Sequence, residues 1–431
     1  MRTVEIINFI IMCLFFACYS YQFFYIPVSL LGRAKPHSAA KLHRYAVLIA
    51  ARNEALVIGQ LIDSVRAQDY PAELVDIYVA ADNCTDATAR VAAGRGATVF
   101  ERHDKSRVGK GYALNFLLRM LGSMENRPEY DGYFVLDADN VMAPDYISEM
   151  NKTFSDGYEV VTCYRNSKNY GDNWISAGYA LWFLREARYL NNARMLLGTS
   201  CAVSGTGFMF SQRVLERCGG WNFFLLTEDI EFTIDNVVHG TKIGYCGTAV
   251  VFDEQPVSFR QSWRQRLRWS RGYLQVIARY GGTLFRGIFG GGGMSCYDMA
   301  MNIMPAAVLT GTSVVVNVAA AFIEFGSGRD LSALALSIGQ TALSLYMTLF
   351  VIGAITTATE WRQIHCSSGK KILYALTFPV FMFTYLPICA ASLVTDVKWQ
   401  PILHGRSMSL DQICAGDKKQ LEVLSCRQKT A

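Results

Sequence analysis

The uncharged apolar run at residues 7–31 places the strongest limit on what this chain can fold into. About 20 apolar residues are enough for a helix to cross a bilayer, so the run predicts a transmembrane helix. It lacks the small-residue cleavage site of a removed signal peptide, which favours a permanent anchor. Three later apolar segments, 304–322, 331–357 and 372–394, predict further spans, whereas residues 32–301 have the mixed composition of a water-soluble region.

The distribution of basic residues around these spans predicts the side of the membrane that each part occupies. Arginine and lysine are more frequent in cytoplasmic loops than in exported ones. They follow the first span and separate the third from the fourth, at Arg33, Lys35, Lys41, Arg44, Arg362, Lys370 and Lys371. The pattern predicts a cytoplasmic middle region with the N-terminus outside. Four crossing spans would also leave the C-terminal tail outside, and a re-entrant segment before residue 304 would reverse that.

Charge and cysteine content exclude two other classes of protein. The formal net charge of +5 is mild, and arginines near the spans account for it through attraction to anionic lipid headgroups, so membrane lipids are expected partners. Nothing in the sequence indicates a nucleic-acid partner. The 12 cysteines contain no Cys-x-x-Cys pair. In a cytoplasmic region such cysteines are expected to be reduced, so a disulfide framework is not expected.

The region between residues 45 and 137 alternates short apolar runs with segments of helical periodicity. Such alternation is typical of repeated β-α-β units and predicts an α/β fold with a mostly parallel sheet. Ligand-binding groups collect beyond the carboxyl ends of parallel strands, which here are the loops after Ala51, Ala81 and Leu136. The expected strands are 45–51, 75–81, 97–100 and the run ending at Asp137, and the expected helices are 55–67, 85–94 and 112–120.

Two carboxylates, Asp137 and Asp139, stand one residue apart at the end of the apolar run 134–136. Alternate side chains of an extended chain point to the same side, so both carboxylates are expected to face one ligand. Two oxygen ligands can hold a hard divalent cation that also binds a diphosphate. Mg²⁺ and Mn²⁺ suit such ligands equally well. The alternative is a solvated acidic turn.

Short motifs in a fixed order resemble those of the family 2 nucleotide-sugar glycosyltransferases. The motifs are Ala51-Arg52-Asn53-Glu54, Ala81-Asp82-Asn83-Cys84-Thr85-Asp86, Gly109-Lys110-Gly111, Asp137-x-Asp139, Thr227-Glu228-Asp229 and Gln265-x-x-Arg268-Trp269. Together they resemble the membrane-embedded branch that holds the cellulose, chitin, hyaluronan and poly-N-acetylglucosamine synthases. The resemblance covers roughly residues 42–280 in detail and the membrane layout in outline.

The resemblance implies a GT-A-type, Rossmann-like catalytic domain inserted between transmembrane helices, in a multi-pass protein of a bacterial inner membrane. With the apolar runs, it divides the chain into five expected parts. These are an N-terminal transmembrane helix (1–32), a cytoplasmic glycosyltransferase domain (33–257), amphipathic interface helices (258–300), three transmembrane helices (301–396) and a C-terminal tail (397–431).

The resemblance also implies which residues bind the nucleotide-sugar. Asp82 is expected to accept the N3–H of uracil, although Asp82 or Asp86 could instead cap the following helix. Lys110 lies between glycines at a helix start, where backbone and charge favour a diphosphate. A surface lysine in a turn is the alternative. The full expected set is Ala51, Arg52, Glu54, Asp82, Lys110, Asp137, Ser204, Gly205, Gln265 and Arg268, with Asp139 and Asp137 as metal ligands.

Thr227-Glu228-Asp229 begins a segment with helical periodicity. Thr227 at the N-cap and acids in the first turn are a sufficient structural explanation of this motif. The chemical explanation is that an inverting transfer needs one base for the acceptor hydroxyl. The resemblance implies that this catalytic base is Asp229, with Glu228 as the next candidate and Thr227 beside the acceptor.

Gln265, Arg268 and Trp269 are spaced to share one face of a helix. Arg268 can contact the diphosphate, and Trp269 offers a flat surface to an acceptor sugar. The alternative is a helix that only lies at the membrane interface, because tryptophans and arginines are interleaved there. Residues 173–197 predict a second interface helix, although Glu186 interrupts its amphipathic pattern. None of the six histidines has ligand spacing.

The expected function is therefore an inverting, metal-dependent hexosyltransferase that moves a sugar from a UDP-sugar to a growing polysaccharide or oligosaccharide, with translocation of the product. Four spans are few for a channel, so export would need a homodimer or an accessory export subunit. One alternative is a single addition to a lipid acceptor. Another is a non-enzymatic membrane scaffold or transporter, which the intact acidic motifs and the almost uncharged spans argue against.

Overall fold

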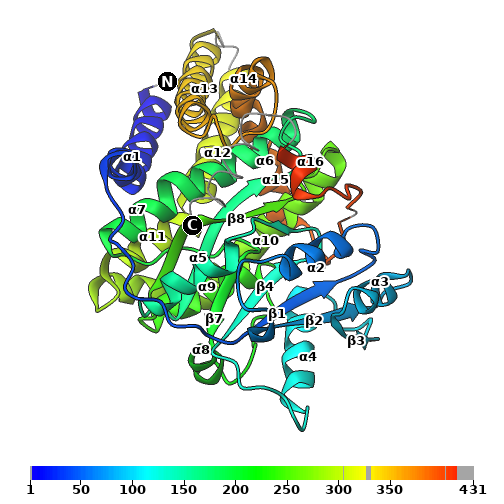
Figure 1. Cartoon of the computed structure of the whole chain (residues 1–431). Helices are drawn as coiled ribbons and strands as arrows, with labels where there is room; N and C mark the ends of the chain where they lie inside the picture. Colours follow the sequence, from blue (N-terminus) through cyan, green and yellow to red (C-terminus); the bar gives the residue numbers. More distant parts are fainter. Residues whose placement is uncertain (1, 304, 327–331, 403, 415–431) are drawn as a thin grey trace.

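A single eight-stranded sheet forms the centre of the protein (Figure 1). The computed structural model describes residues 2–303, 305–326, 332–402 and 404–414. The strand order is β3-β2-β1-β4-β7-β6-β8-β5. The strands are β1 (Tyr45–Ala51), β2 (Val75–Asp82), β3 (Thr98–Arg102), β4 (Gly132–Asp137), β5 (Val141–Met142), β6 (Val160–Ser167), β7 (Phe208–Ser211) and β8 (Ile243–Asp253).

The prediction of a mostly parallel sheet is confirmed. Strands β3, β2, β1 and β4 run parallel, and so do β6 and β8. The short strand β7 lies antiparallel between β4 and β6, and β5 lies antiparallel to β8. The sequence analysis located the parallel strands β1 to β4, whose crossover helices are easily recognised, but did not locate the later strands.

Both faces of the sheet are covered because alternate residues of β1 are buried in different cores. Val47 and Ile49 pack in the cluster that includes α2 (Ile58–Arg66) and α5 (Tyr146–Ser155), whereas Leu48 packs with residues of α4 (Lys110–Gly122). Burial on both faces explains why the strands read as continuous apolar runs.

Two predicted helices begin later than expected, because local hydrogen bonds hold the preceding loops in other conformations. Helix α2 begins at Ile58 rather than at residue 55, after a turn in which the Glu54 carbonyl accepts from Val57 and Ile58. Helix α3 (Thr88–Gly94) begins three residues later than predicted. Asp86 accepts from the Thr88 backbone at 3.0 Å, so Asp86 rather than Asp82 stabilises this helix start.

Within the described residues, three stretches are long and apolar enough to cross a membrane: Ile6–Leu31, Ile338–Thr359 and Ser368–Val394. The predicted span 304–322 begins outside the described residues, and its described part includes a shorter apolar helix, Gly311–Ile323. The helices concerned are α1 (Arg2–Leu31), α12 (Pro305–Gly326), α13 (Ser332–Thr359), α14 (Ser368–Phe383) and α15 (Tyr385–Val394). Figure 1 shows α1, α13 and α14 gathered at one end of the molecule, away from the sheet.

The last apolar stretch is broken into α14 and α15 at Thr384. Arg266, on the long helix α10 (Phe259–Phe289), is fully buried against the break. It donates to the Phe381 carbonyl at 3.2 Å and to the Thr384 hydroxyl at 2.6 Å, and its guanidinium lies 4.8 Å from the Tyr385 ring. The segment 372–394 therefore consists of two successive helices, and α15 packs along the arginine-rich helix α10.

The C-terminal tail returns to the sheet. His404 pairs with Glu54 at 2.9 Å, and the backbone amides of Gly405 and Arg406 donate to Glu254. Helix α16 (Leu410–Cys414) adds Ile413 to an apolar cluster on β5 and β8. An arrangement in which four crossing spans put the tail opposite the catalytic region is therefore wrong.

A buried ion pair joins three helices beneath the sheet. Arg194 of α7 (Asn192–Leu197) and Asp298 of α11 (Gly293–Ile303) are fully buried, with two nitrogen–oxygen contacts of 2.7 and 2.8 Å. The hydroxyls of Tyr21 and Tyr25 in α1 donate to the same carboxylate, each at 2.8 Å. The Asp298 carboxylate thus connects helix α1 to helices α7 and α11.

Replacing Arg194 with methionine is expected to lower the free energy of unfolding by about 3–5 kcal/mol, because it leaves the Asp298 charge buried and unpaired. Combining it with Asp298→Asn removes both charges, keeps an acceptor for the tyrosines and should recover much of the loss. Arg213→Met, at an exposed pair with Glu159, is the control and should cost less than about 1 kcal/mol. Denaturant unfolding in detergent measures all three, and equal losses in Arg194→Met and the control would refute the assignment.

Candidate active site

Six carboxylates gather at the carboxyl ends of the parallel strands, where open α/β sheets bind ligands. They follow or end β1, β2, β4 and β8, and are Glu54, Asp82, Asp137, Asp139, Asp253 and Glu254. The sequence analysis predicted the first four. It missed Asp253 and Glu254, although an apolar strand ending in adjacent acids is the same signal that identified Asp137.

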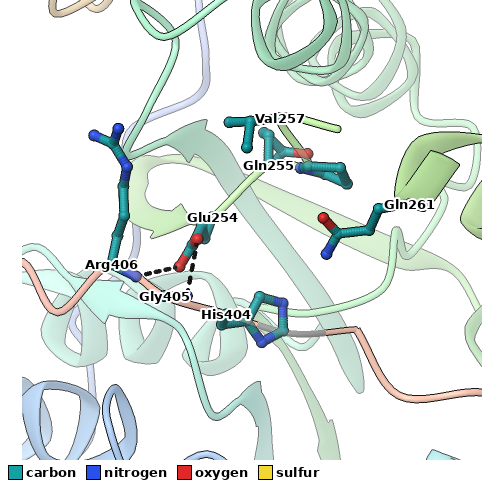
Figure 2. Close-up of a pocket in the computed structure, with 8 residues that line it drawn as sticks. Glu254, Gln255, Val257, Gln261, His404, Gly405 and Arg406 are labelled. Atoms are coloured by element: carbon teal, nitrogen blue, oxygen red, sulfur yellow. Dashed lines mark hydrogen bonds between the residues drawn. The ribbon is translucent and has the colours of Figure 1, made fainter. Parts of the chain in front are cut away.

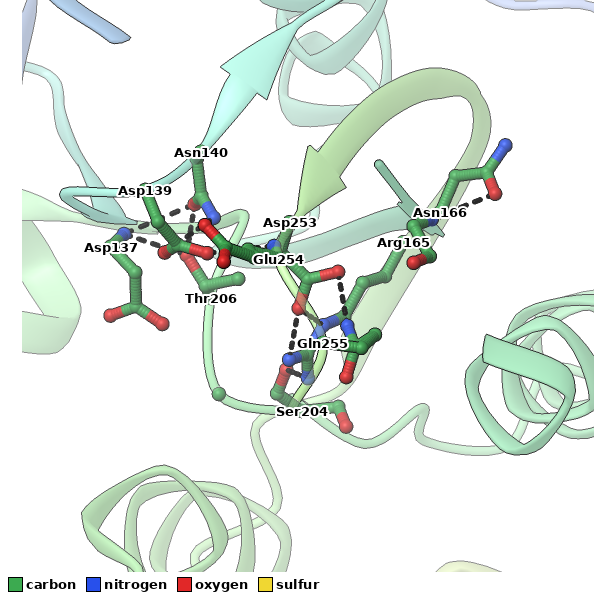
Figure 3. Close-up of polar contacts among 12 residues, drawn as sticks. Asp137, Asp139, Asn140, Arg165, Asn166, Ser204, Thr206, Asp253, Glu254 and Gln255 are labelled. Carbon is green, nitrogen blue, oxygen red and sulfur yellow. Dashed lines mark hydrogen bonds and ion pairs between the residues drawn. The ribbon is translucent and has the colours of Figure 1, made fainter. Parts of the chain in front are cut away.

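Four of the six carboxylates at this edge are paired with a cation from another part of the chain. Lys110 lies 2.5 Å from Asp137, Arg102 lies 2.6 Å from Asp82, and His404 pairs with Glu54. The Arg165 Nε lies 2.7 Å from Asp253, as Figure 3 shows. Buried charges are costly unless they are paired and hydrogen-bonded, so these pairs are a condition for closing the edge of the sheet.

The side chains of Asp137 and Asp139 point in different directions (Figure 3). Strand β4 ends at Asp137, and Ala138 and Asp139 form a turn. The Asp139 Oδ2 accepts from the Glu254 amide at 2.8 Å, whereas Asp137 points to Lys110. The prediction that strand alternation puts both carboxylates on one side is wrong, because the extended conformation ends between them.

Asp139 is 4% exposed and held as a carboxylate. Burial alone would raise its pKa, but the positive charges of His404 and Lys168 outweigh burial and lower the pKa below its usual value. The described residues form no cluster of three or more acidic, histidine or cysteine ligands for a metal ion. Mg²⁺ and similar cations are often held by only one or two carboxylates plus substrate phosphates. The two aspartates therefore fit a divalent ion that arrives with a diphosphate.

Gly205 connects the two halves of the site. Its φ of +77° lies in the left-handed region, which favours glycine. Its amide donates to the Asp229 Oδ2 at 2.6 Å, and its carbonyl accepts from the Lys110 Nζ at 2.8 Å. The predicted base and the predicted diphosphate-binding lysine thus meet on one peptide turn, and Lys110 continues the connection to Asp137.

Thr227, Glu228 and Asp229 stand at the start of α9 (Glu228–Val238), as predicted. Thr227 occupies the N-cap position, but its side chain makes no capping hydrogen bond. Its buried hydroxyl faces Gly272 of α10, where an added Cβ would lie only 2.5 Å away. Thr227 is 3% exposed, so the structure gives it no opening toward an acceptor.

Glu228 and Asp229 differ in their access to solvent. Glu228 is 8% exposed, and burial together with the adjacent Asp229 charge raises its pKa. Asp229 is half-buried, and only its Oδ2 is bonded to Gly205. Asp229 is therefore the more accessible of the two bases.

Arg268 and Trp269 of α10 contact two different parts of the site, and Gln265 stands on the same helix. Arg268 donates to the Leu226 carbonyl at 2.8 Å, just before the acidic motif. Gln265 has a buried side-chain oxygen with no partner among the described residues. Trp269 packs edge-on against Tyr179 and Phe183 of α6 (Trp174–Arg185), with ring centroids 5.7 and 6.2 Å apart. Arg268 and Trp269 thus connect α9 to the interface helix α6.

The tail crosses the loops predicted to bind the donor. The Trp399 ring lies 5.3 Å from the Arg52 guanidinium, and a Cβ added at Gly109 would lie 3.8 Å from that ring. Ala51, in the same predicted motif as Arg52, is buried at the end of β1. Asp82 is 3% exposed and paired with Arg102, which borders a cavity of about 550 Å³. Asp82, which is expected to bind the uracil, therefore lies next to an ion pair that borders this cavity.

His404 is a site residue that sequence reasoning missed. Figure 2 shows it beside Glu254 and Gln261 in a pocket of about 330 Å³. Burial lowers the His404 pKa, but the charges of Asp139 and Glu54 raise it further, to about 10. No local spacing could have identified His404, because its partner Glu54 is 350 positions away in the chain.

Comparison with known proteins identifies a family match over more than half of the chain. The family described as "Glycosyltransferase like family 2" matches residues 43–272. A beta-monoglucosyldiacylglycerol synthase of a Synechocystis species is 26% identical over 240 residues, covering 54% of this chain and 48% of that protein. A poly-beta-1,6-N-acetyl-D-glucosamine synthase of Staphylococcus epidermidis is 24% identical over 242 residues, covering 54% and 55%.

The chain thus spans about half the length of the curated relatives that it matches. Similarity in structure extends further. A mannosyltransferase from Pyrobaculum calidifontis, solved in complex with GDP-Man and Mn²⁺, superimposes with a TM-score of 0.58 at 18% identity. The match covers 90% of this chain and 99% of that one, so the GT-A fold and the helices around it are shared.

The His404–Glu54 contact predicts a pH-dependent contribution to stability. The pKa of His404 is about 6.5 when unfolded and about 10 when folded, so the pair stabilises the folded protein fully below about pH 6.5. That stabilisation is lost as the pH rises through about 10. The difference in unfolding free energy between wild type and His404→Gln should therefore shrink from pH 6.5 to pH 10. His239→Gln, at a 55% exposed side chain, is the control. A difference that stays constant with pH would contradict the pairing.

Proposed function

Since the chain belongs to glycosyltransferase family 2, we propose that it is an inverting, metal-dependent hexosyltransferase that moves a sugar from a UDP-sugar to the hydroxyl of a growing glycan. The observation that carries the proposal is the Gly205 turn. It holds Asp229 on one side and Lys110, with Asp137, on the other. A base for the acceptor and a cation for the diphosphate are thus fixed at one point.

The donor binds along the carboxyl edge of the sheet. Asp82 receives the uracil, and Lys110 lies at the start of α4, where a helix N-terminus and a cation favour the diphosphate. Asp139 and Asp137 hold Mg²⁺ or Mn²⁺, which when bound neutralises the charge of the diphosphate. Gln265 and Arg268 complete the diphosphate side, and Arg52, Glu54 and Ser204 line the donor. The Mn²⁺ in the similar mannosyltransferase supports a divalent ion without selecting Mn²⁺ over Mg²⁺.

Asp229 acts on the acceptor. Its Oδ2 is fixed by the Gly205 amide, which leaves the other carboxylate oxygen to take the proton of the acceptor hydroxyl. As that proton leaves, the acceptor oxygen attacks the anomeric carbon, and UDP departs from the opposite face of the sugar. Trp269 supports the acceptor ring. The raised pKa of Glu228 and its burial make it a weaker candidate for the base at neutral pH.

The membrane helices suit an enzyme whose product is exported. We place residues 33–257 on the cytoplasmic side of a bacterial inner membrane, where UDP-sugars are made, with 258–300 as interface helices. The described part of the chain has three candidate spans, which are few for a channel. Export of a polymer would therefore use a homodimer or an accessory subunit.

A second candidate function is the single addition of a sugar to a lipid. The relatives that support it are the beta-monoglucosyldiacylglycerol synthases of cyanobacteria, at 24–26% identity. Both functions use the same donor site and the same base. They differ in the acceptor, which is a sugar in one case and a diacylglycerol in the other.

The metal assignment predicts that Asp139→Asn abolishes Mn²⁺-dependent release of UDP from UDP-glucose and UDP-N-acetylglucosamine, because it removes one of the two carboxylates. The fold should persist, as judged by a cooperative thermal unfolding transition without metal, although its midpoint should fall because the amide no longer offsets the charges of His404 and Lys168. Asp235→Asn, on the far end of α9, is a matched control that should keep full activity. Normal metal-dependent turnover in Asp139→Asn would overturn the assignment.

The base assignment predicts different effects of Asp229→Asn and Trp269→Ala. Asp229→Asn should lower the transfer rate about 10²-fold or more, the usual effect of losing a general base, while UDP affinity changes little. Trp269→Ala removes the surface under the acceptor, so it should weaken acceptor use and shorten any polymer while hydrolysis of the donor partly survives.

Calorimetry of UDP binding and assays of product formation, on the same preparations, separate these effects. If Asp229→Asn loses UDP affinity in proportion to its activity, then Asp229 belongs to the donor site. The base would in that case be sought at Glu228.

A further inference from the structure

Glu186 is a carboxylate near the site that the proposed mechanism does not use. It is the first residue of η2 (Glu186–Asn191), a π-helical turn between α6 and α7. Such turns often occur at functional sites, because the wider turn redirects side chains. In the sequence, Glu186 interrupts an otherwise amphipathic interface helix. Its side chain remains partly exposed in the structure.

The contacts of Glu186 leave one of its oxygens available. Its Oε2 accepts from the Ser204 hydroxyl at 3.1 Å. Among the described residues, no other hydrogen bond to this carboxylate is present, and no lysine or arginine nitrogen pairs with it within 4.0 Å. Burial raises its pKa, which the more distant charges of Arg194, Arg165 and Arg185 partly oppose. The Oε1 atom can therefore accept a hydrogen bond from a ligand.

Glu186 and Asp229 flank the same turn. Ser204 donates to Glu186, and the next residue, Gly205, donates to Asp229. Ser204 and Gly205 are adjacent in the chain, so their Cα atoms are about 3.8 Å apart. Both carboxylates act on Tyr273, whose pKa is raised first by burial and then by the charges of Glu186 and Asp229.

The residues around this turn keep part of their surface exposed. Ser204, Gly205, Asp229 and Tyr273 are all half-buried. Tyr273 stands four residues after Trp269 on α10, so both lie on the same face of that helix. Arg165 also contacts the turn, since it donates to the Ser204 carbonyl at 3.0 Å (Figure 3). Its guanidinium packs on the Phe183 ring.

We propose that Glu186 binds a second hydroxyl of the acceptor, beside the one that Asp229 deprotonates, and thereby selects a sugar acceptor over a lipid with a single hydroxyl. The inference rests on the proposed function and decides between its two candidate acceptors. A carboxylate with a spare oxygen accepts readily from hydroxyls, and such charged hydrogen bonds are among the stronger ones. A sugar offers several hydroxyls, whereas a diacylglycerol offers one. Glu186 is thus a specificity residue rather than a second base.

The first experiment measures acceptor binding without turnover. Cellobiose and N,N′-diacetylchitobiose are titrated by calorimetry into the full-length protein saturated with UDP and Mn²⁺. Wild type should bind at least one disaccharide, and Glu186→Ala should weaken that binding about 10- to 100-fold, the effect of one charged hydrogen bond. Glu186→Gln keeps the shape of the side chain and should lose less. UDP affinity should stay the same in both variants.

The second experiment measures transfer from UDP-glucose and UDP-N-acetylglucosamine to the same disaccharides and to dioctanoylglycerol. The Glu186 variants should raise KM for the disaccharide with little change in kcat and no change toward dioctanoylglycerol. Glu216→Gln, at an exposed carboxylate on α8 (Gln212–Arg217), is the matched control and should behave as wild type.

Three results would overturn the proposal. One is a wild type that binds neither disaccharide. Another is an equal loss for both classes of acceptor, and the third is a loss of UDP affinity in Glu186→Gln, which would make Glu186 structural. Disaccharide binding that depends on Glu186 in a protein that transfers no sugar would refute the proposed function alone, because the binding assay needs no turnover.

Discussion

The pairing of charges at the carboxyl edge of the sheet is the constraint on which the rest of the structure depends. Six carboxylates converge there, and a buried carboxylate is tolerated only with a cation or hydrogen-bond donors close by. Lys110, Arg102, Arg165 and His404 come from four separate segments to provide them. The end of β3, the strand β6, the start of α4 and the C-terminal tail are thus held around one small region. The same charges leave the edge ready for a donor that brings both a diphosphate and a metal ion.

The Gly205 turn links two groups of residues at this edge, Lys110 with Asp137 on one side and Asp229 on the other. Its carbonyl belongs to the Lys110–Asp137 side, and its amide belongs to Asp229. Ser204, the preceding residue, extends the acceptor side to Glu186 on the interface helices. Because these contacts are made by one peptide turn, with Gly205 in a left-handed conformation, the groups that we propose for the donor and the acceptor are coupled through it. Helix α10 supports the arrangement, since Arg268 contacts the turn before Asp229 and Trp269 packs on α6.

The membrane helices and the site are connected by buried polar contacts rather than by apolar packing alone. Arg266 holds the break between α14 and α15, and Arg194 with Asp298 fastens α1. Both arginines are fully buried in helices next to the acceptor side. The tail then leaves α15 and crosses the donor loops at Trp399 and His404. The tail that follows the last candidate span therefore borders the loops predicted to bind the donor.

The sequence by itself determined the α/β fold, the strands β1 to β4, the three described candidate spans and the identity of the acidic and Gln-x-x-Arg-Trp motifs. These features depend on residues close together in the chain, where hydrophobic periodicity and short motifs carry the signal. The sequence did not determine that Asp137 and Asp139 point apart, because the turn after β4 is fixed by Asn140 and Thr206, whose side chains bond to the Asp137 amide and to each other. Nor did it determine the roles of Glu254, Arg165 or His404. Their partners lie far away in the chain, and only the tertiary structure, which must neutralise every buried charge, decided which segments meet.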